Sequence, residues 1–176
     1  NLRPRQRDYL EKVYFAGQSL LGVVNDILDL SKIESGMLKM EAIPFDLNQV
    51  FDNLANFTAT KAQDKGLELL FQLPFDRDYQ LVGDPLRLGQ VLINYTNNAI
   101  KFTKRGGVSL MVDAAPTPDK RVALRFCVRD TGIGIAPDDL ARLFQPFTQL
   151  DSKLTRQYEG TGLGLSLVSR MAEMHG

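Results

Sequence analysis

The residues of this chain best suited to chemistry are two asparagines and two later glycine-rich clusters. The asparagines are Asn94 and Asn98, and the clusters are Asp130-Thr-Gly-Ile-Gly-Ile135 and Gly160-Thr-Gly-Leu-Gly-Leu165. A glycine lets the backbone approach a base or a phosphate, and an asparagine oxygen can ligate a hard cation without adding charge. A lone pair of glycines marks a turn more often than a nucleotide site. In this order and combination, however, the residues predict a pocket for ATP and a divalent metal.

The two asparagines lie one helical turn apart on a predicted helix and therefore share a face. With Asn97, three asparagines crowd this helix, although each costs about 0.6 kcal/mol relative to alanine. A binding site would explain this cost, and polar capping of neighbouring backbone is the alternative. Lys101 falls near the same face, where its ammonium could reach phosphate oxygens; a solvated surface lysine is the alternative.

The glycine clusters each have a structural and a functional interpretation. Asp130 closes a predicted strand and could accept hydrogen bonds from its own turn. Alternatively, its carboxylate could accept the exocyclic amine of adenine, with Gly132 and Gly134 close to the base. The second cluster precedes a predicted helix over 165–174, whose free N–H groups and dipole would face a phosphate.

The composition limits what else the chain can do. At 176 residues and 44% hydrophobic content, it can build one core with a smaller appended element. Lysine plus arginine equals aspartate plus glutamate at 21 each, so no net field favours nucleic acid or an anionic membrane. No apolar run approaches the roughly 18 residues of a transmembrane helix, and the polar start is unlike a signal peptide. We expect a cytoplasmic piece with no nucleic-acid partner and no direct membrane contact.

Several site classes are poor interpretations of this sequence. The single histidine, His175, lies at the end of the last predicted helix, where it would meet the helix dipole. The single cysteine, Cys127, falls in a strand-like run and is expected to be a buried, inert thiol. Serine-histidine-acid triads and zinc clusters are therefore disfavoured, and disulfides within one chain are excluded. The P-loop pattern is absent, and neither glycine cluster has the strand-turn-helix context of the dinucleotide fingerprint.

A long amphipathic helix is predicted from about Pro4 to Ser35. Its main apolar positions follow alternating steps of four and three: Tyr9, Val13, Ala16, Leu20, Val23, Ile27 and Leu30. A parallel stripe makes the apolar face wider than a two-stranded coiled coil needs: Leu10, Tyr14, Leu21, Val24 and Leu28. At about 1.5 Å per residue the helix would be about 45 Å long, too long to pack wholly on so small a domain. We expect it to project and join a four-helix bundle; an ordinary core helix is the alternative.

The rest of the chain predicts a sheet with helices on one face. Asp46 and Asp84 are expected to cap the two larger helices, one over 47–65 and one that begins at Pro85. The expected strands cover 37–45, 67–73, 108–114 and 121–128. The remaining expected elements are a short helix over 137–144, a mobile polar loop over 145–159 and the last helix.

Four segments together resemble the sequence boxes of sensor histidine kinases. The stretch from Asp84 through Asn94, Asn98 and Lys101 to Thr103 resembles the N box. The other three are Asp130-Thr-Gly-Ile-Gly134 for the G1 box, Leu143-Phe-Gln-Pro-Phe147 for the F box and Gly160-Thr-Gly-Leu-Gly164 for the G2 box. The segment 28–36 also resembles the end of the second dimerisation helix of hybrid kinases, so the resemblance covers nearly the whole chain.

The resemblance implies an α+β fold and a division of the chain into two parts. The fold would be the two-layer α/β sandwich of histidine kinase, gyrase and heat-shock chaperone ATPases, preceded by a long bundle-forming helix. Residues 1–36 would be part of a dimerisation and phosphotransfer domain, contributing its second helix only. Residues 37–176 would be an ATP-binding catalytic domain that is truncated at its C-terminus.

The resemblance also assigns roles to individual residues. Asn98 would hold Mg2+, Asn94 and Lys101 would serve catalysis, and Lys101 and Arg156 would contact phosphates. Asp130 would read adenine, and 145–159 would form a lid anchored by Phe144 and Phe147. The residues expected to contact ATP are Asn94, Asn98, Lys101, Asp130, Gly132, Gly134, Arg156, Gly160, Thr161, Gly162, Leu163 and Gly164.

The chain also departs from the family pattern. The Ser-His-Glu-x-x-Arg-Thr-Pro setting of the phosphoacceptor histidine is absent, and the resemblance makes His175 an ordinary part of the last helix. Glu159 stands where a glycine is frequent, which would alter lid motion. Tyr95-Thr96 stands where small aliphatic residues are usual.

The resemblance implies the ATP-binding core of a two-component sensor histidine kinase. The complete protein would transfer the γ-phosphoryl of ATP to a histidine and then to a receiver aspartate, and the fragment would bind nucleotide without labelling itself. Its partners would be a second copy, paired through the long helix, and a response regulator or receiver domain. The complete protein could be anchored in the inner membrane. The alternatives are a gyrase-like or chaperone-like ATP hydrolase, and a non-catalytic docking module of the same fold.

Overall fold

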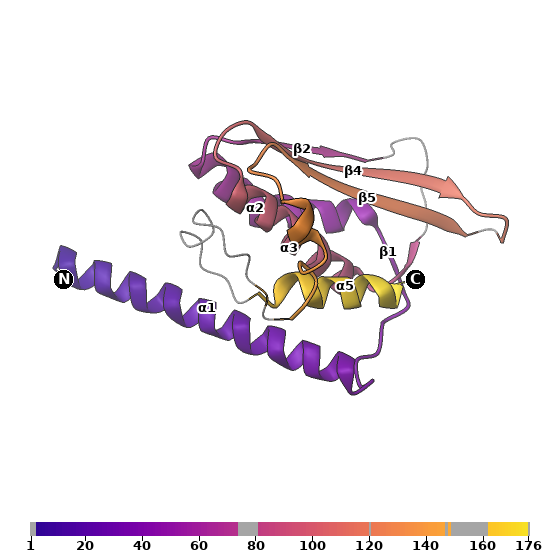
Figure 1. The fold of residues 1–176 in the computed structure, drawn as a ribbon, viewed down its shortest axis with the longest axis horizontal. Helices are drawn as coiled ribbons and strands as arrows, with labels where there is room; N and C mark the ends of the chain where they lie inside the picture. The colour runs from indigo at the N-terminus through magenta and orange to yellow at the C-terminus, as the bar shows by residue number, and fades with distance from the viewer. Residues whose placement is uncertain (1–2, 74–80, 120, 147, 149–161, 176) are drawn as a thin grey trace.

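The computed structural model describes residues 3–73, 81–119, 121–146, 148 and 162–175. A long helix, α1 (Pro4–Glu34), lies along one side of a layer of shorter helices, and a sheet covers the opposite side of that layer (Figure 1). The architecture is therefore a helix layer and a sheet layer with α1 added outside, as the sequence predicted.

The larger sheet has three strands in the order β2 (Glu68–Gln72), β4 (Gly107–Pro116) and β5 (Val122–Asp130). β2 runs parallel to β4, with Leu69 opposite Val108, and β4 runs antiparallel to β5, with Val108 opposite Asp130. Val108 and alternate residues along β4 are buried because successive side chains of a strand point to opposite faces. The register brings the end of β5, which carries Asp130, beside the start of β4.

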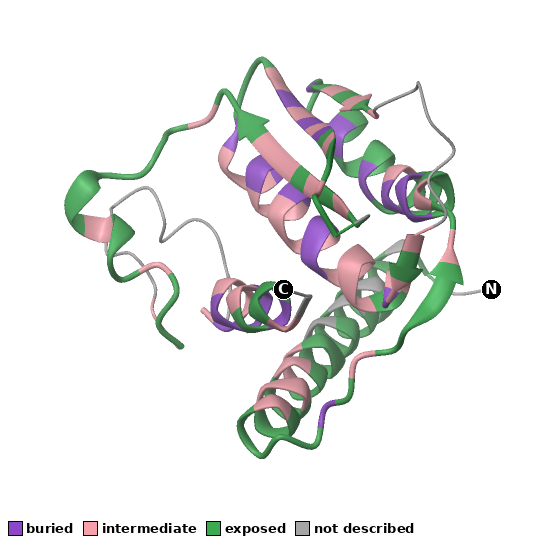
Figure 2. Ribbon diagram, turned by 90° about the vertical axis from the view of Figure 1, so that its right-hand side faces the viewer, coloured by how far each residue is buried: buried purple, intermediate pink, exposed green. Residues whose placement is uncertain are grey.

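Two helices, α2 (Leu47–Asp64) and α3 (Pro85–Phe102), cover one face of this sheet. Leu54 of α2, Leu92 of α3 and Leu110 of β4 are each at most 1% exposed and belong to one apolar cluster. Figure 2 shows buried segments of the helices on the side that faces the sheet. Asp46 and Asp84 cap the two helices through their side chains, as the sequence predicted.

A second, two-stranded sheet differs from the prediction. The expected strand over 37–45 is reduced to β1 (Ile43–Phe45), which pairs with β3 (Leu81–Gly83), a strand that the sequence did not predict. A strand extends only as far as its partner, and β3 offers three residues. The expected helix over 137–144 is likewise shorter: α4 spans Pro137–Leu140, and residues 141–144 form turns.

The last helix, α5 (Gly164–His175), packs against α3 and the end of α1. Leu30 and Ile33 of α1 contact the apolar cluster of Val91, Leu167, Val168 and Met171. Towards the other end of α1, Val13 is 68% and Leu20 is 64% exposed. The helix therefore projects beyond the domain, as predicted. Within the described ranges, no helix combines the length and apolar content required to cross a bilayer.

Leu110→Ala should lower the free energy of unfolding by about 2–5 kcal/mol, because the fully buried side chain leaves a cavity between sheet and helices. Leu70→Ala is the matched control, since Leu70 is 58% exposed on the neighbouring strand, and should cost about 1 kcal/mol or less. Urea unfolding monitored by circular dichroism measures both. Equal losses for the two variants would contradict this placement of the core.

Candidate nucleotide site

The polar face of α3 carries a hydrogen-bonded pair of asparagines. Nδ2 of Asn98 donates to Oδ1 of Asn94 at 3.0 Å, and both residues are half-buried. The opposite face of α3 is apolar and lies in the core, which leaves this face directed away from the sheet. The bond uses the nitrogen of the Asn98 amide, so the carbonyl oxygen of the same group is the atom suited to a cation.

The asparagine pair lines a half-open cavity of about 280 Å³ between three helices. The lining residues are Asn25, Asp26 and Asp29 of α1, Gln90, Ile93, Asn94, Asn97 and Asn98 of α3, and Leu167, Val168 and Met171 of α5. The wall from α3 is mostly amide, the wall from α5 is apolar, and the wall from α1 carries two carboxylates. Sequence reasoning missed the α1 and α5 walls, because no local signal reveals which helices meet.

The last glycine of the second cluster, Gly164, lies directly against Asn94. A Cβ atom at Gly164, where α5 begins, would lie 2.5 Å from Nδ2 of Asn94. Gly162, two residues earlier, has a φ of +71°, a conformation that glycine adopts readily. The first backbone N–H groups of α5 lack partners within the helix, and its positive dipole end favours an anion. Gly164 therefore lies against Asn94, and the binding of phosphates by this cluster stays a prediction.

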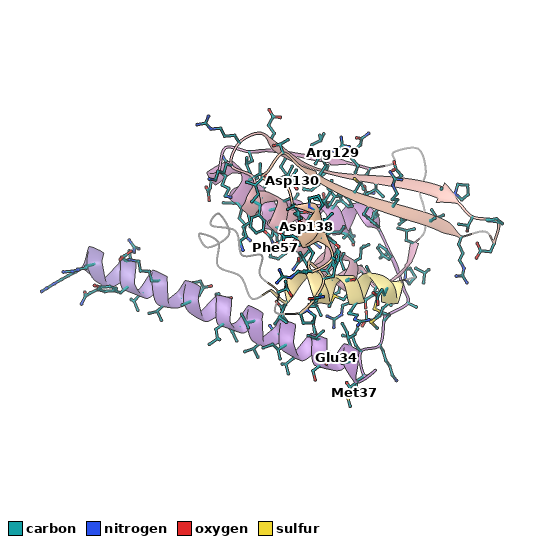
Figure 3. All side chains as sticks on the ribbon, viewed as in Figure 1. Glu34, Met37, Phe57, Arg129, Asp130 and Asp138 are labelled. Carbon is teal, nitrogen blue, oxygen red and sulfur yellow. The ribbon has the colours of Figure 1, made fainter. Side chains whose placement is uncertain are left out.

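The first glycine cluster meets the other end of α3. A Cβ atom at Gly132 would lie 2.7 Å from the carbonyl oxygen of Phe102, the last residue of α3. The N–H of Gly132 donates to Oδ1 of Asp130 at 2.8 Å, so Asp130 accepts a hydrogen bond within its own turn. Figure 3 shows Asp130 where β5 ends, far from Glu34 at the end of α1. The recognition of adenine by Asp130, together with a contact from Gly134, stays a prediction.

Two lysines lie at the C-terminal end of α3. Burial lowers the pKa of Lys101, whose Nζ lies 5.1 Å from the centre of the Phe102 ring. Lys65, at the end of α2, donates from Nζ to the carbonyl oxygens of Ile100 at 2.7 Å and Lys101 at 2.8 Å. An ammonium at these carbonyls complements the negative end of the helix dipole. Lys65 thus holds the end of α3 that carries Lys101. The sequence did not indicate this role, because nothing around Lys65 shows that it lies next to α3.

Several predicted site residues have no described placement. Arg156, Gly160 and Thr161 lie outside the described residues, as do Glu159 and Phe147 and most of the expected lid. Phe144 is 48% exposed. His175 is the last residue of α5. Leu163 is predicted to contact ATP, but its side chain is 1% exposed in the core, so only its backbone could do so.

The donor set suits a cation that arrives with phosphates. Among the described residues, no cluster of three or more His, Cys, Asp or Glu could hold a metal ion. Mg2+ is commonly held by few protein oxygens together with the phosphates of a substrate. The Asn94 and Asn98 amides at the cavity wall fit that mode of binding.

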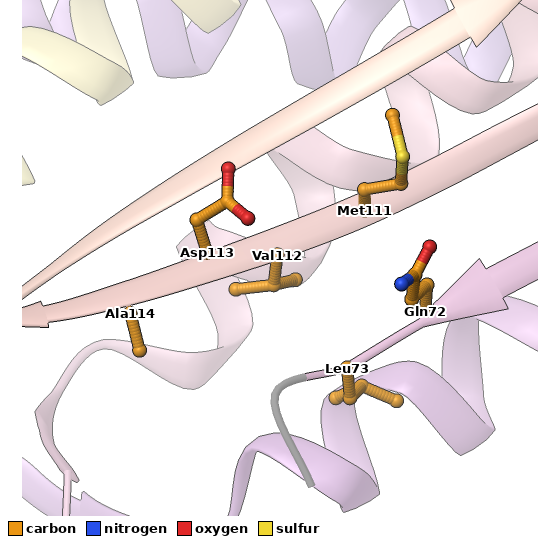
Figure 4. Close-up of a pocket in the computed structure, with 6 residues that line it drawn as sticks. All are labelled: Gln72, Leu73, Met111, Val112, Asp113 and Ala114. Carbon is orange, nitrogen blue, oxygen red and sulfur yellow. The ribbon is translucent and has the colours of Figure 1, made fainter.

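A second hollow, of about 320 Å³, lies between the end of β2 and the middle of β4 (Figure 4). It is lined by Gln72, Leu73, Met111, Val112, Asp113 and Ala114. It shares no lining residue with the asparagine cavity and contains none of the predicted site residues. The geometry therefore places the candidate site at α3 and not at this sheet edge.

Comparison with known proteins identifies the family of this chain. The profile of the family described as "Histidine kinase-, DNA gyrase B-, and HSP90-like ATPase" matches residues 83–176, more than half of the chain. The chain belongs to this family. The matched segment includes the asparagines of α3 and both glycine clusters, so the expected family is confirmed.

Relatives of this ATPase-family chain include named histidine kinases. It is 41% identical over 175 residues to the signal transduction histidine-protein kinase BarA of Escherichia coli strain K12. It is 44% identical over 175 residues to the sensor histidine kinase GacS of Pseudomonas protegens. Both matches cover 99% of this chain and 19% of the relative, so the chain spans about a fifth of their length.

Solved structures confirm the two-layer fold with its preceding helix. Full-length ShkA, crystallised in complex with AMPPNP, superposes with a TM-score of 0.78 and 35% sequence identity. That match covers 98% of this chain and 35% of ShkA. The histidine kinase AdeS of Acinetobacter baumannii has a TM-score of 0.72 at 23% identity over 97% of this chain and 74% of AdeS, a likeness of fold alone.

Gly164→Ala should displace the Asn94 side chain, because the new methyl group would lie 2.5 Å from its Nδ2 atom. Since a flexible side chain can move, the melting temperature should not fall. Gly17→Ala in α1, with nothing within 4 Å, is the control. The side-chain amide resonances of Asn94 should shift in the first variant only. Unchanged Asn94 resonances in Gly164→Ala would contradict the contact.

Proposed function

We propose that this chain is the ATP-binding part of a sensor histidine kinase of the hybrid type. In the complete protein, the γ-phosphoryl of ATP would pass to a histidine and then to a receiver aspartate. The observation that carries the proposal is the Asn94–Asn98 pair at the cavity, with Gly164 against Asn94. The resemblance of nearly the whole chain to BarA and GacS supports it.

Each side chain has a distinct task in this proposal. The carbonyl oxygen of Asn98 would ligate Mg2+, which supplies charge neutralisation for the phosphates when it is bound. Asn94 would orient the phosphate chain, and the first turn of α5 would donate N–H groups to it. Lys101 would add a positive charge, and a phosphate beside it would oppose the lowering of its pKa by burial. Asp130, Gly132 and Gly134 would surround adenine.

The amide of Asn94 also bears on the choice between phosphotransfer and hydrolysis. By the family resemblance, the gyrase-like hydrolases have a glutamate at this position that acts as a general base towards water. An amide cannot take up that proton at neutral pH. The site would therefore preserve ATP for transfer to a side chain instead of consuming it in hydrolysis.

The exposed apolar stripe of α1 supports the proposed division of the chain. Residues 1–36 would belong to a dimerisation and phosphotransfer bundle, and residues 37–176 to the catalytic domain. Tyr9, Val13 and Leu20 are more than half exposed, and pairing with a second copy would bury them. The complete protein would act on a receiver domain at the cytoplasmic face of the inner membrane.

Asn98→Ala should weaken the Mg2+-dependent binding of AMPPNP at least tenfold, or about 1.4 kcal/mol, because a cation ligand is lost. Isothermal titration calorimetry with and without Mg2+ measures the effect. Asn53→Ala, at an exposed position of α2, is the matched control and should bind as the wild type does.

Four outcomes would contradict the proposal or one of its assignments. If the Asn98→Ala and Asn53→Ala variants bound AMPPNP with equal affinity in the presence of Mg2+, Asn98 would not be a ligand of the metal. Steady phosphate release from ATP with Mg2+ would identify a hydrolase instead, and failure of the wild-type chain to bind AMPPNP would indicate a docking module. Acid-labile phosphate on His175 after incubation with ATP would overturn the assignment of that residue.

A further inference from the structure

The third asparagine of α3, Asn97, also lines the asparagine cavity, where it is half-buried beside Asn94 and Asn98. A hydrogen bond joins it to α2: Nζ of Lys61 donates to Oδ1 of Asn97 at 3.0 Å. Lys61 lies in the last turn of α2 and is exposed. Because it bonds a residue of the cavity lining, its ammonium lies at the edge of the cavity.

The contact with Lys61 determines how the amide of Asn97 is turned. An ammonium can only donate hydrogen bonds, so the group that faces Lys61 must be the amide oxygen. The nitrogen of the same amide, Nδ2, keeps two N–H donors, and in the described part of the chain it bonds to no acceptor. Asn98 shows the opposite arrangement, because its nitrogen donates to Asn94 and its oxygen is left over.

An amide nitrogen beside an ammonium suits an anion with several acceptor oxygens. Hydrogen bonds from N–H groups to ionised oxygens are shorter and stronger than those to neutral ones. The α1 side of the cavity repels such a ligand, since it carries the carboxylates of Asp26 and Asp29. Burial and the neighbouring Asp29 carboxylate both raise the pKa of Asp26, so further negative charge is disfavoured there. An anion in the cavity is therefore better placed against α3, near Asn97 and Lys61.

We propose that Asn97 is a phosphate-binding residue of this site and that Lys61 is the positioning residue that turns its amide. This inference rests on the proposed function, because it names a further contact of the same nucleotide. Asn98 would meet the cation through an oxygen, and Asn97 would meet a phosphate oxygen through its nitrogen. Two adjacent amides would thus hold the opposite charges of one Mg2+–nucleotide complex.

Three substitutions separate the donor of Asn97 from the charge of Lys61. Asn97→Leu removes the N–H donors at nearly constant size, and Asn97→Asp replaces them with a carboxylate that can still pair with Lys61. Lys61→Met removes the ammonium that orients the amide. Asn53→Asp is the matched control, because it adds the same charge at an exposed position of α2 outside the cavity lining.

The effect is measured with and without phosphates on the ligand. Calorimetry gives the affinity for AMPPNP with Mg2+, and a titration followed by 15N chemical shifts gives the affinity for adenosine. Asn97→Leu should weaken AMPPNP binding about tenfold, as expected for the loss of a hydrogen bond to a charged acceptor, and Asn97→Asp should weaken it further. Adenosine affinity should stay unchanged in both, and the melting temperature of Asn97→Asp should not fall.

A double-mutant cycle tests the role of Lys61. Lys61→Met alone should weaken AMPPNP binding about threefold, and in the Asn97→Leu background it should have no further effect, because Lys61 acts through the amide. An equal loss in both backgrounds would show that Lys61 acts by its own charge and would overturn its positioning role.

The phosphate contact of Asn97 is overturned if Asn97→Leu binds AMPPNP as the wild type and Asn53→Asp do. It is also overturned if Asn97→Leu weakens adenosine and AMPPNP equally, since that result identifies a structural role. If the wild-type chain binds no AMPPNP, the proposed function fails and this contact fails with it. Wild-type binding with unaffected Asn97 variants overturns the contact alone.

Discussion

The whole site depends on how α3 is fixed at its two ends. At the start, the carboxylate of Asp84 is 4% exposed; its Oδ1 accepts the N–H of Arg87 at 3.0 Å, and its Oδ2 accepts the N–H of Glu41 at 3.1 Å. At the other end, the ammonium of Lys65 bonds the last carbonyls of α3. These charged groups complement both ends of the helix dipole. They also tie α3 to the chain before β1 and to α2, so Asn94 and Asn98 project from a helix with little freedom to move.

The position of α3 determines both the core on one of its faces and the cavity on the other. Its apolar face completes the core with Leu54 and Leu110, and its polar face forms the cavity. Its last carbonyl lies so close to Gly132 that a side chain there would collide. One helix thereby sets the relative positions of the asparagines and of both glycine clusters. A site divided among independent loops would need separate restraints for each part.

The same helix carries features that stability alone does not favour. Asparagines are weak helix formers, and Asn94, Asn97 and Asn98 occupy its middle turns. Thr96 is fully buried, and its hydroxyl has no hydrogen-bond partner among the described residues. An unpaired buried hydroxyl costs about 1–3 kcal/mol. Nothing in the structure accounts for Thr96, whereas the asparagines are accounted for by their place at the cavity.

Local signals in the sequence predicted most of the helices and strands. Contacts between residues far apart in the sequence could not be predicted from it. Asp46 and Asp84 marked the starts of α2 and α3 because a cap acts within its own first turn. β3 was missed because its three residues are a strand only through pairing with β1. The Arg87–Asp29 ion pair joins residues 58 positions apart. No sequence pattern around either residue indicates that the two side chains meet. Asp130 had two interpretations from sequence, and the structure shows the hydrogen bond within its own turn while leaving adenine recognition as a prediction.

The central claim is that one nucleotide site joins the asparagines of α3 to both glycine clusters. Titration of the 15N-labelled chain with Mg2+ and AMPPNP tests it most directly, by following the side-chain amides of Asn94 and Asn98 and the backbone amides of Gly132 and Gly164. Our account predicts that all four signals shift with a single dissociation constant, while the backbone amide of Asp113, at the hollow between β2 and β4, stays in place. Shifts at Asp113 with unmoved asparagine amides, or separate dissociation constants for the two glycines, would contradict it.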